Sequence, residues 1–96
     1  MAFKIFSSSE ALGDLLALTS YIAQDNPDAA EPVGSAILHK VSSLEQHPFI
    51  GRKVPETNDP KLRELIERPF RIIYRVRRPE RVAEVPRVWH GARGRA

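Results

Sequence analysis

The chain contains no cysteine among its 96 residues. The absence of thiols excludes disulfide bonds and cysteine nucleophiles, and it suits a reducing compartment. The chain also lacks any apolar run of about 18 residues, and residues 1–9 carry one lysine and no long apolar stretch. These absences disfavour a membrane span and a secretory signal peptide, so we expect a cytoplasmic protein.

Histidine is scarce as well. The three histidines, His39, His47 and His90, do not lie at metal-ligand spacing from one another. We therefore expect neither a bound metal ion nor a cofactor. With 42% apolar and 28% charged residues in 96 positions, the chain is expected to form one globular domain over residues 1–96.

The charges are distributed unevenly along the chain. Residues 1–51 contain two lysines and six acidic residues, a net charge of −4, whereas residues 52–96 contain thirteen basic and six acidic residues, a net charge of +7. Eleven of those thirteen basic residues are arginines. Arginine binds phosphates through its planar fork and stacks on bases. The second half therefore carries either a solvated arginine face or an anion-binding surface for RNA, DNA or an acidic protein segment.

The first half predicts a strand and two helices. Residues 3–6 alternate in the manner of a strand, and Ser7–Ser9 supply caps for a helix that begins beside Glu10. The apolar stripe of this helix is expected to consist of Leu12, Leu15, Leu16, Thr19 and Ile22.

A second helix follows the Asp25-Asn26-Pro27 turn. Its apolar face is expected to contain Ala30, Val33, Ile37, Val41 and Leu44. Pro32 predicts either a kink or a regular helix that begins near Glu31, and His47-Pro48 ends the segment. The tight turn indicates an antiparallel helical hairpin.

The second half predicts strands. Residues 49–60 are interpreted as a loop, residues 61–67 as a strand, and residues 70–77 as a strand with Phe70, Ile72, Tyr74 and Val76 on its core face. A turn at 78–81 precedes a last strand at 82–89, in which Pro86 predicts a bulge or an unpaired side. The tail at 91–96 is expected to be loose.

The predicted order is β-α-α-β-β-β, an α+β fold. The strands joined by short loops are expected to form an antiparallel sheet, with the N-terminal helical hairpin packed on one face. The opposite face is then free to carry the arginines.

Several short sequence segments follow one another along the predicted helices and strands. They are Asp14-Leu15, Tyr21-Ile22-Ala23, Asp25-Asn26-Pro27, His47-Pro48-Phe49-Ile50-Gly51, Val54-Pro55-Glu56, Arg63-Glu64-Leu65, Phe70-Arg71-Ile72-Ile73-Tyr74-Arg75-Val76 and Val88-Trp89-His90-Gly91-Ala92-Arg93. In order and spacing, from residue 3 to residue 93, the chain resembles the RelE/ParE toxin superfamily of type II toxin–antitoxin systems.

The resemblance implies a toxin that a cognate antitoxin neutralises in a hetero-oligomeric complex. RelE-type members enter the ribosome and cleave mRNA, whereas ParE-type members share the fold and inhibit DNA gyrase without a nuclease site. We also expect the antitoxin to present acidic groups to Arg71, Arg75 and Arg93, and apolar groups to a groove beside the helical hairpin.

Metal-free RNA cleavage needs a base, positive charge on the phosphate and an acid. Similarity to the YoeB-like branch implies that Glu56 is the base, that Arg63 and Arg71 bind the phosphate, and that His90 transfers a proton. The remaining candidates for contact with RNA or another target are Lys53, Arg75, Arg77, Trp89 and Arg93. On this reading the chain is a ribosome-dependent mRNA endoribonuclease.

Other readings of the same residues remain open. Glu56 is also interpreted as a solvated carboxylate, Arg63 as the ion-pair partner of an acid such as Glu84, and Trp89 as a packing residue. The segment after His90 lacks the aromatic residue common in RelE-type nucleases, and the His-Gly-x-Arg ending is similar to ParE-type chains. Gyrase inhibition is therefore the alternative function, and a degenerate paralogue or simple nucleic-acid binder that has lost toxicity is a third.

Overall fold

The computed structural model describes residues 2–91. Arg93 and residues 92–96 of the tail predicted at 91–96 lie outside the described residues. Gly91, the first residue of that predicted tail, is described, and its N–H donates to the carbonyl oxygen of Pro69. Strand β1 (Lys4–Ser7) leads into helix α1 (Ser9–Asp25). Ser8 caps this helix, since its hydroxyl oxygen accepts a hydrogen bond from the Ala11 N–H at 3.0 Å. The predicted strand, cap and helix are confirmed.

Helix α2 (Pro27–Ser42) packs against α1 as the expected hairpin. It begins at Pro27 and runs through Pro32, so the alternative of a regular helix that begins only near Glu31 is wrong. Pro27 is at the first helical turn, where its missing N–H costs nothing. A short 3₁₀ helix, η1 (Ser43–Glu45), then leads to the turn before Pro48.

The sheet has five strands rather than four. Besides β1 it contains β2 (Arg52–Lys53), β3 (Leu62–Glu67), β4 (Phe70–Arg77) and β5 (Val82–His90). Strand β2 lies in the segment interpreted as a loop, and two residues are too few to show a strand's alternation. It is held by pairing with Arg63 and Glu64 of β3.

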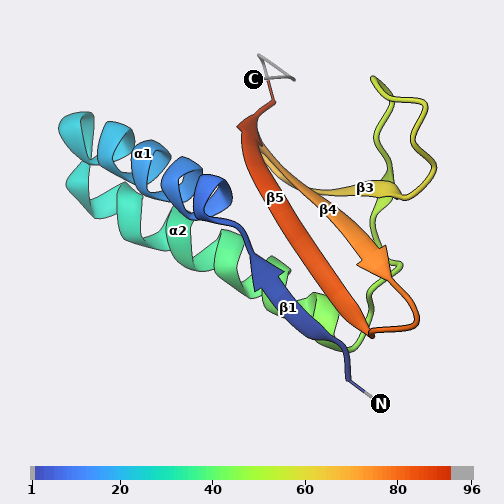
Figure 1. Ribbon diagram of the computed structural model, residues 1–96. Coiled ribbons are helices and arrows are strands. Elements are labelled where there is room, and N and C mark those ends of the chain that lie inside the picture. The colour runs from blue at the N-terminus through green and yellow to red at the C-terminus, as the bar shows by residue number, and fades with distance from the viewer. Residues whose placement is uncertain (1, 92–96) are drawn as a thin grey trace.

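The strand order is β1-β5-β4-β3-β2, and the sheet is mixed. Strands β2 to β5 pair antiparallel as expected, but β1 pairs parallel with β5. An entirely antiparallel sheet is therefore a wrong expectation for β1. The helical hairpin carries the chain from β1 to the far edge of the sheet, and the strands then return until β5 lies beside β1 (Figure 1).

Pro86 lies at an irregularity in β5, as predicted. Ile73 of β4 pairs with Arg87 and Arg75 pairs with Glu84, so Tyr74 faces two residues of β5. This geometry is a β-bulge, which tolerates a residue without an N–H. The Ser8 hydroxyl donates to the carbonyl oxygen of Pro86 at 2.8 Å, which ties the start of α1 to the bulge.

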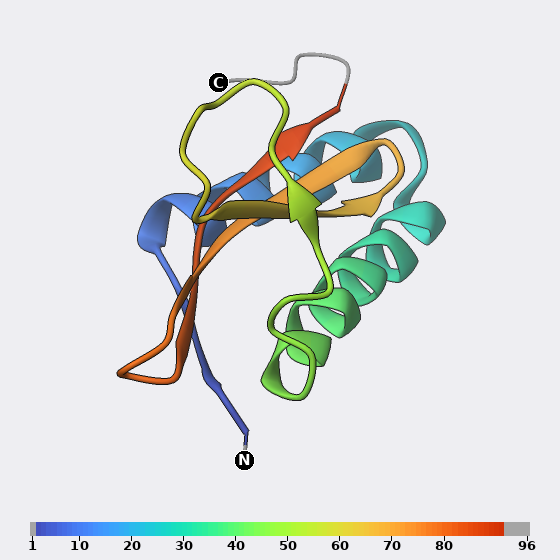
Figure 2. The ribbon, with the colours of Figure 1, turned by 90° about the vertical axis from the view of Figure 1, so that its right-hand side faces the viewer.

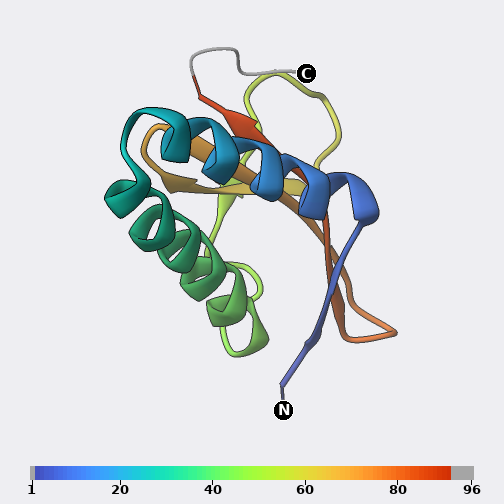
Figure 3. The ribbon, with the colours of Figure 1, turned by 90° about the vertical axis from the view of Figure 1, so that its left-hand side faces the viewer.

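Both helices cover the same face of the sheet (Figures 1 and 3). The core lies between them and the sheet, and Tyr74 is fully buried there as predicted. The buried cluster consists of Ala11, Ile37, Leu44, Phe70, Ile72, Tyr74, Ala83 and Val85. Figure 2 shows the other side of the sheet, where the chain between β2 and β3 arches away from the helices. Neither helix of the described chain combines the length and apolarity that crossing a membrane requires.

The stripe predicted for α1 is partly wrong. Leu12 is 55% exposed and Leu16 is 68% exposed. The side that packs on the core is formed instead by Ala11, Leu15, Leu18 and Ile22. Periodicity identifies a helix with an apolar side, but the contact of α1 with β5 decides where the centre of that side lies.

Candidate functional site

The uncovered face of the sheet carries an arginine held by two carboxylates. Arg71 of β4 donates from both terminal nitrogens to Glu56, at 2.7 and 2.6 Å, and from Nε to Glu64 at 2.7 Å. Its side chain is only 8% exposed. The bidentate pair with Glu56 is the geometry in which arginine binds carboxylates most strongly. The structure thus brings the predicted base and one predicted phosphate-binding group into direct contact.

Glu64 is the buried centre of this cluster. Its side chain is fully buried, and it accepts hydrogen bonds from Arg71 and from Arg52 Nε, the latter at 2.6 Å. The pKa of the Arg71 guanidinium is raised, first by the hydrogen bonds to Glu56 and, despite the opposing effect of burial, also by Glu64. Arg52, Glu56, Glu64 and Arg71 therefore form a neutral set of two cations and two anions, a cluster named below the Arg71 cluster.

The alternation of β3 and β4 separates Arg63 from this cluster. Arg63 pairs directly with Tyr74, whereas Arg71 pairs with Ile66. Directly paired residues point to the same side of a sheet, so Arg63 lies on the side of Tyr74 and Arg71 on the opposite side. The two arginines predicted to bind one phosphate therefore do not lie on one face.

Arg63 is held by the chain that precedes β2. One of its terminal nitrogens donates to the carbonyl oxygen of Gly51 at 2.8 Å, and its guanidinium lies 5.3 Å from the centroid of the Phe49 ring. The suggested ion pair of Arg63 with Glu84 is wrong, because Glu84 pairs with Arg77 at 2.9 Å.

His90 lies at the end of β5 and pairs directly with Phe70. Its exposed ring packs edge-on against the Phe70 ring, with 5.5 Å between the centroids. By the same pairing rule it points to the side of Phe70, away from Glu56 and Arg71. Trp89 pairs with Arg71 instead, and its ring lies 5.8 Å from that guanidinium.

The other candidate binding residues are spread over the sheet. Lys53 is exposed in β2, opposite Arg63. Arg75 forms an ion pair with Asp59 at 3.0 Å, and Arg77 forms one with Glu84. Arg93 is outside the described residues. Among residues 2–91, no three His, Cys, Asp or Glu side chains gather as a metal site would need.

Sequence reasoning missed Glu64 and Arg52. A signal for Glu64 was present, because the short turn between β3 and β4 sets Ile66 opposite Arg71. Glu64 is then one alternation further along the same face, within reach of a long arginine side chain. Arg52 gave no such signal, since β2 is recognisable only in the folded sheet.

Comparison with known proteins identifies the family. Residues 5–94 match the family described as "ParE toxin of type II toxin-antitoxin system, parDE". No curated protein matches the chain.

Solved structures agree on the fold. A toxin in the chromosomal ParDE system of P. aeruginosa is 24% identical, with a TM-score of 0.77 over 93% of this chain and 96% of that one. A mutant of the E. coli toxin RelE in the free state is 20% identical, with a TM-score of 0.69 over 94% of this chain and 84% of that one. The RelBE2 complex of Mycobacterium tuberculosis contributes a chain 15% identical, with a TM-score of 0.68 over 94% and 99%. With a family match over residues 5–94 and this shared fold, the chain belongs to the ParE toxins of the RelE/ParE superfamily and is the toxin of a type II toxin–antitoxin system.

Proposed function

We propose that this toxin arrests growth as a ParE-type inhibitor of DNA gyrase and does not cleave mRNA. The observation that carries the proposal is the engagement of Arg71 by two carboxylates, Glu56 and Glu64. A scissile phosphate at Arg71 would meet two negative charges, one of them in a fully buried side chain. Removing one partner of such a buried pair costs about 3–5 kcal/mol, so phosphate does not displace Glu64 readily.

The position of Glu56 supports the same proposal. A general base needs a lone pair aimed at the hydroxyl proton. Both carboxylate oxygens of Glu56 accept hydrogen bonds from Arg71, so the carboxylate is held facing that guanidinium. Arg63 and His90 point to the other side of the sheet, so the base, the second phosphate-binding group and the acid do not share one face.

The choice of gyrase as the target rests on the ParE-type family assignment and not on a pocket in the structure. The family match and the P. aeruginosa ParDE structure both name ParE-type systems. Bacterial gyrase acts in the cytoplasm, and we place the toxin there. The alternative function is cleavage of mRNA on the ribosome. It is supported by the similarity to RelE-type structures, whose TM-scores are lower.

A cognate antitoxin is the second partner. Two of the similar structures are named as a toxin–antitoxin system and a toxin–antitoxin complex. The outer side of the helical hairpin offers an apolar groove of about 590 Å³. Its lining includes Leu12, Leu16, Thr19, Ala23, Ala30 and Leu38. We propose that an apolar face of the antitoxin lies in this groove.

Induced expression of the chain tests the proposal, with mRNA sequencing and plasmid supercoiling measured in the same cultures. The variants are Glu56→Gln, which keeps hydrogen-bonding oxygen at Arg71, and Glu56→Gln combined with His90→Ala. We expect growth arrest, altered supercoiling and intact mRNA with the native chain, and unchanged arrest with both variants. Cleaved mRNA that disappears in the double variant would instead assign Glu56 and His90 to a nuclease site.

A further inference from the structure

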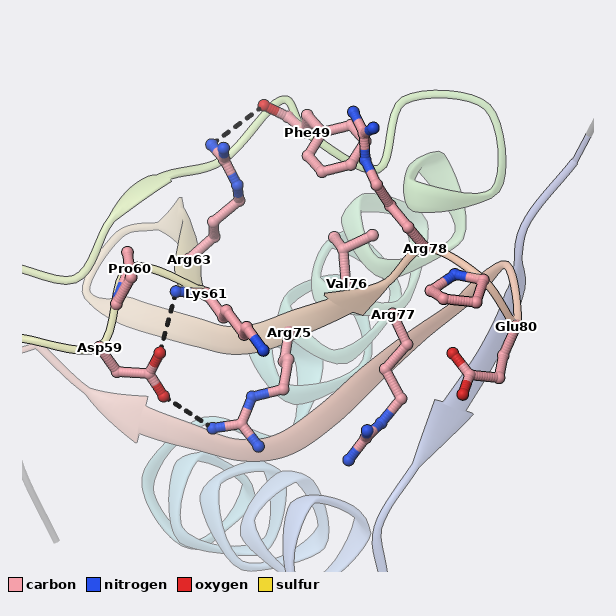
Figure 4. Close-up of a pocket in the computed structure, with 11 residues that line it drawn as sticks. Phe49, Asp59, Pro60, Lys61, Arg63, Arg75, Val76, Arg77, Arg78 and Glu80 are labelled. Atoms are coloured by element: carbon pink, nitrogen blue, oxygen red, sulfur yellow. Dashed lines mark hydrogen bonds and ion pairs between the residues drawn. The ribbon is translucent and has the colours of Figure 1, made fainter.

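A groove opens where β4 extends beyond its neighbour. Strand β3 begins at Leu62, opposite Arg75, so Val76 and Arg77 have no β3 residue beside them. The groove has a volume of about 750 Å³ and is formed by the Phe49 segment, the start of β3, and the end of β4 with its turn (Figure 4). This volume lies within the range of about 300–1,000 Å³ typical of ligand sites. The Arg71 cluster lies outside this groove, since none of its residues lines it.

The charges that line the groove are mostly positive. Five cations and two anions give a net charge of +3, from Lys61, Arg63, Arg75, Arg77 and Arg78 against Asp59 and Glu80. Arg75 and Arg77 have carboxylate partners, in Asp59 and Glu84. In the part of the chain that the structure describes, no ion pair engages Lys61, Arg63 or Arg78. The groove therefore presents three uncompensated cations to an incoming anion.

One donor at this site also lacks an acceptor. The Nε of Arg75 is buried and has no hydrogen-bond partner among residues 2–91. Buried polar groups in folded proteins nearly always have a partner. Because this nitrogen has almost no accessible surface, an anion in the groove would reach it after a movement of the Arg75 side chain, which is part of the lining.

Besides its charged side chains, the groove has a flat aromatic surface at Phe49. The ring is 42% exposed, and its centroid lies 5.3 Å from the Arg63 guanidinium and 4.9 Å from that of Arg78. Figure 4 shows both guanidinium groups beside this ring. Arg63 is further fixed by its hydrogen bond to the Gly51 carbonyl oxygen. Aromatic rings and guanidinium planes are the surfaces on which unpaired bases stack.

We propose that this groove binds single-stranded nucleic acid. The phosphates contact Lys61, Arg63 and Arg78, and a base stacks on the guanidinium of Arg78, which lies over the Phe49 ring at 4.9 Å from its centroid. An acidic peptide would use the cations but would leave the flat surfaces without a partner, which is why a nucleic acid is the better match. This activity goes beyond gyrase inhibition, since the proposed target of the toxin is a protein.

Fluorescence anisotropy with the purified full chain tests the proposal. The probes are labelled oligothymidylate and oligouridylate of about 12 nucleotides, a length within the range of known single-strand site sizes. The variants are Arg78→Ala, which removes an exposed turn residue, and Phe49→Leu, which keeps apolar bulk and removes the flat ring. Arg68→Ala is the matched control, because Arg68 is an exposed arginine in the turn between β3 and β4 and does not line the groove.

We expect each groove variant to weaken binding about tenfold, in line with the energy of one base stack. Arg78→Ala should also reduce the slope of log K against log salt by about 0.7, the value for one phosphate contact on a single strand. Arg68→Ala should leave affinity within about threefold. Melting temperatures of all variants report whether the fold is intact. Tighter binding of the DNA or of the RNA probe identifies the source of the strand.

Three results would overturn the proposal. The first is an equal loss of affinity in Arg68→Ala and Arg78→Ala, which would mean attraction by net charge alone. The second is an oligoglutamate peptide that binds more tightly than either oligonucleotide, which would assign the groove to an acidic protein segment. The third is the absence of any anisotropy change for the native chain at about 0.1 M salt, where single-strand binders of this kind associate.

Discussion

At the scale of single residues, Arg71 shows what the alternation of side chains along a strand predicts and what it does not predict. The pattern from Phe70 to Arg77 predicts that Arg71 points away from the core, and the structure confirms this side. It does not predict that the side chain is buried. Glu56 and Glu64 cover it, and both approach from other segments of the chain. A charged residue on a non-core face is therefore solvent-exposed only where no loop folds over it.

Gly51 provides a prediction at this scale. A methyl group at this position would lie 2.6 Å from atoms of the Tyr74 ring and 2.7 Å from the Glu64 carbonyl oxygen. Tyr74 is fully buried and its hydroxyl accepts a hydrogen bond from the Gly51 N–H at 2.8 Å, so neither group can move aside cheaply. We expect Gly51→Ala to lower the free energy of unfolding by about 2–3 kcal/mol, as overpacking does in a filled core.

Gly13 is the matched control for that change. It lies in α1, and a methyl group there meets nothing within 4 Å. Gly13→Ala should raise the free energy of unfolding by about 0.5–1 kcal/mol, because alanine loses less backbone entropy in a helix. Urea unfolding monitored by circular dichroism measures both variants. Equal effects of the two substitutions would contradict the steric argument for Gly51.

At the scale of secondary-structure elements, Asp14 joins α1 to β5. Its carboxylate accepts two hydrogen bonds from Arg87, at 2.8 and 2.9 Å, and one from the Val88 N–H at 2.9 Å. Burial by itself raises the pKa of Asp14, but these hydrogen bonds outweigh it and hold the pKa below the ordinary value of 3.8. The contact of helix and sheet is therefore strongest when Asp14 is ionised.

The contact of Asp14 with Arg87 predicts that the free energy of unfolding depends on pH. Because the folded-state pKa of Asp14 is lowered, its contribution is fully present above pH 3.8 and is lost as the pH falls through the folded-state pKa. We expect Asp14→Asn to cost about 1 kcal/mol at neutral pH, a small value because Arg87 is partly exposed. The gap between the free energies of unfolding of the variant and of the native chain should then narrow below pH 3.8.

Urea unfolding between about pH 3 and pH 7 measures this gap, over the range in which carboxylates titrate. Asp25→Asn is the control, because Asp25 is exposed at the end of the same helix. Its replacement should change the free energy of unfolding by less than about 0.5 kcal/mol at neutral pH. A gap for Asp14→Asn that is constant over the whole range would rule out the proposed ionic contribution.

At the scale of the whole molecule, the two layers differ in chemistry. The helical layer belongs to the half of the chain with net charge −4, and the strands β2 to β5 belong to the half with net charge +7. The helical layer nevertheless exposes an apolar groove that includes Leu12, Leu16 and Leu38. A partner that covers this groove and another that contacts the basic sheet would meet different faces of one small protein.

The antitoxin proposal makes a prediction for the helical layer. Leu16→Glu changes a residue that is exposed in the free toxin, so its free energy of unfolding should change by less than about 0.5 kcal/mol. Affinity for the antitoxin should fall about tenfold to a hundredfold, the effect of losing one buried leucine. Calorimetric titration with the purified antitoxin measures it.

Tyr21→Glu is the control for this experiment. Tyr21 is exposed on the same helix but does not line the groove, so its replacement should leave the affinity unchanged. If both variants bind the antitoxin as tightly as the native chain, the antitoxin does not occupy the groove.

The sequence by itself determined those features that depend on neighbours along the chain. The cap at Ser8, the helical hairpin, the alternating face of β4 and the bulge at Pro86 are set by periodicities of 3.6 and 2 and by local turn chemistry. The short sequence segments that resemble the family could be recognised for the same reason, because each consists of neighbouring residues.

Only the tertiary structure decided which distant residues meet. The parallel pairing of β1 with β5, the exposure of Leu12 and Leu16, the burial of Glu64 beside Arg71, and the separation of Arg63 from Arg71 all depend on register and packing between segments. One residue of register moves a side chain to the other face of a sheet, and no local pattern specifies that register.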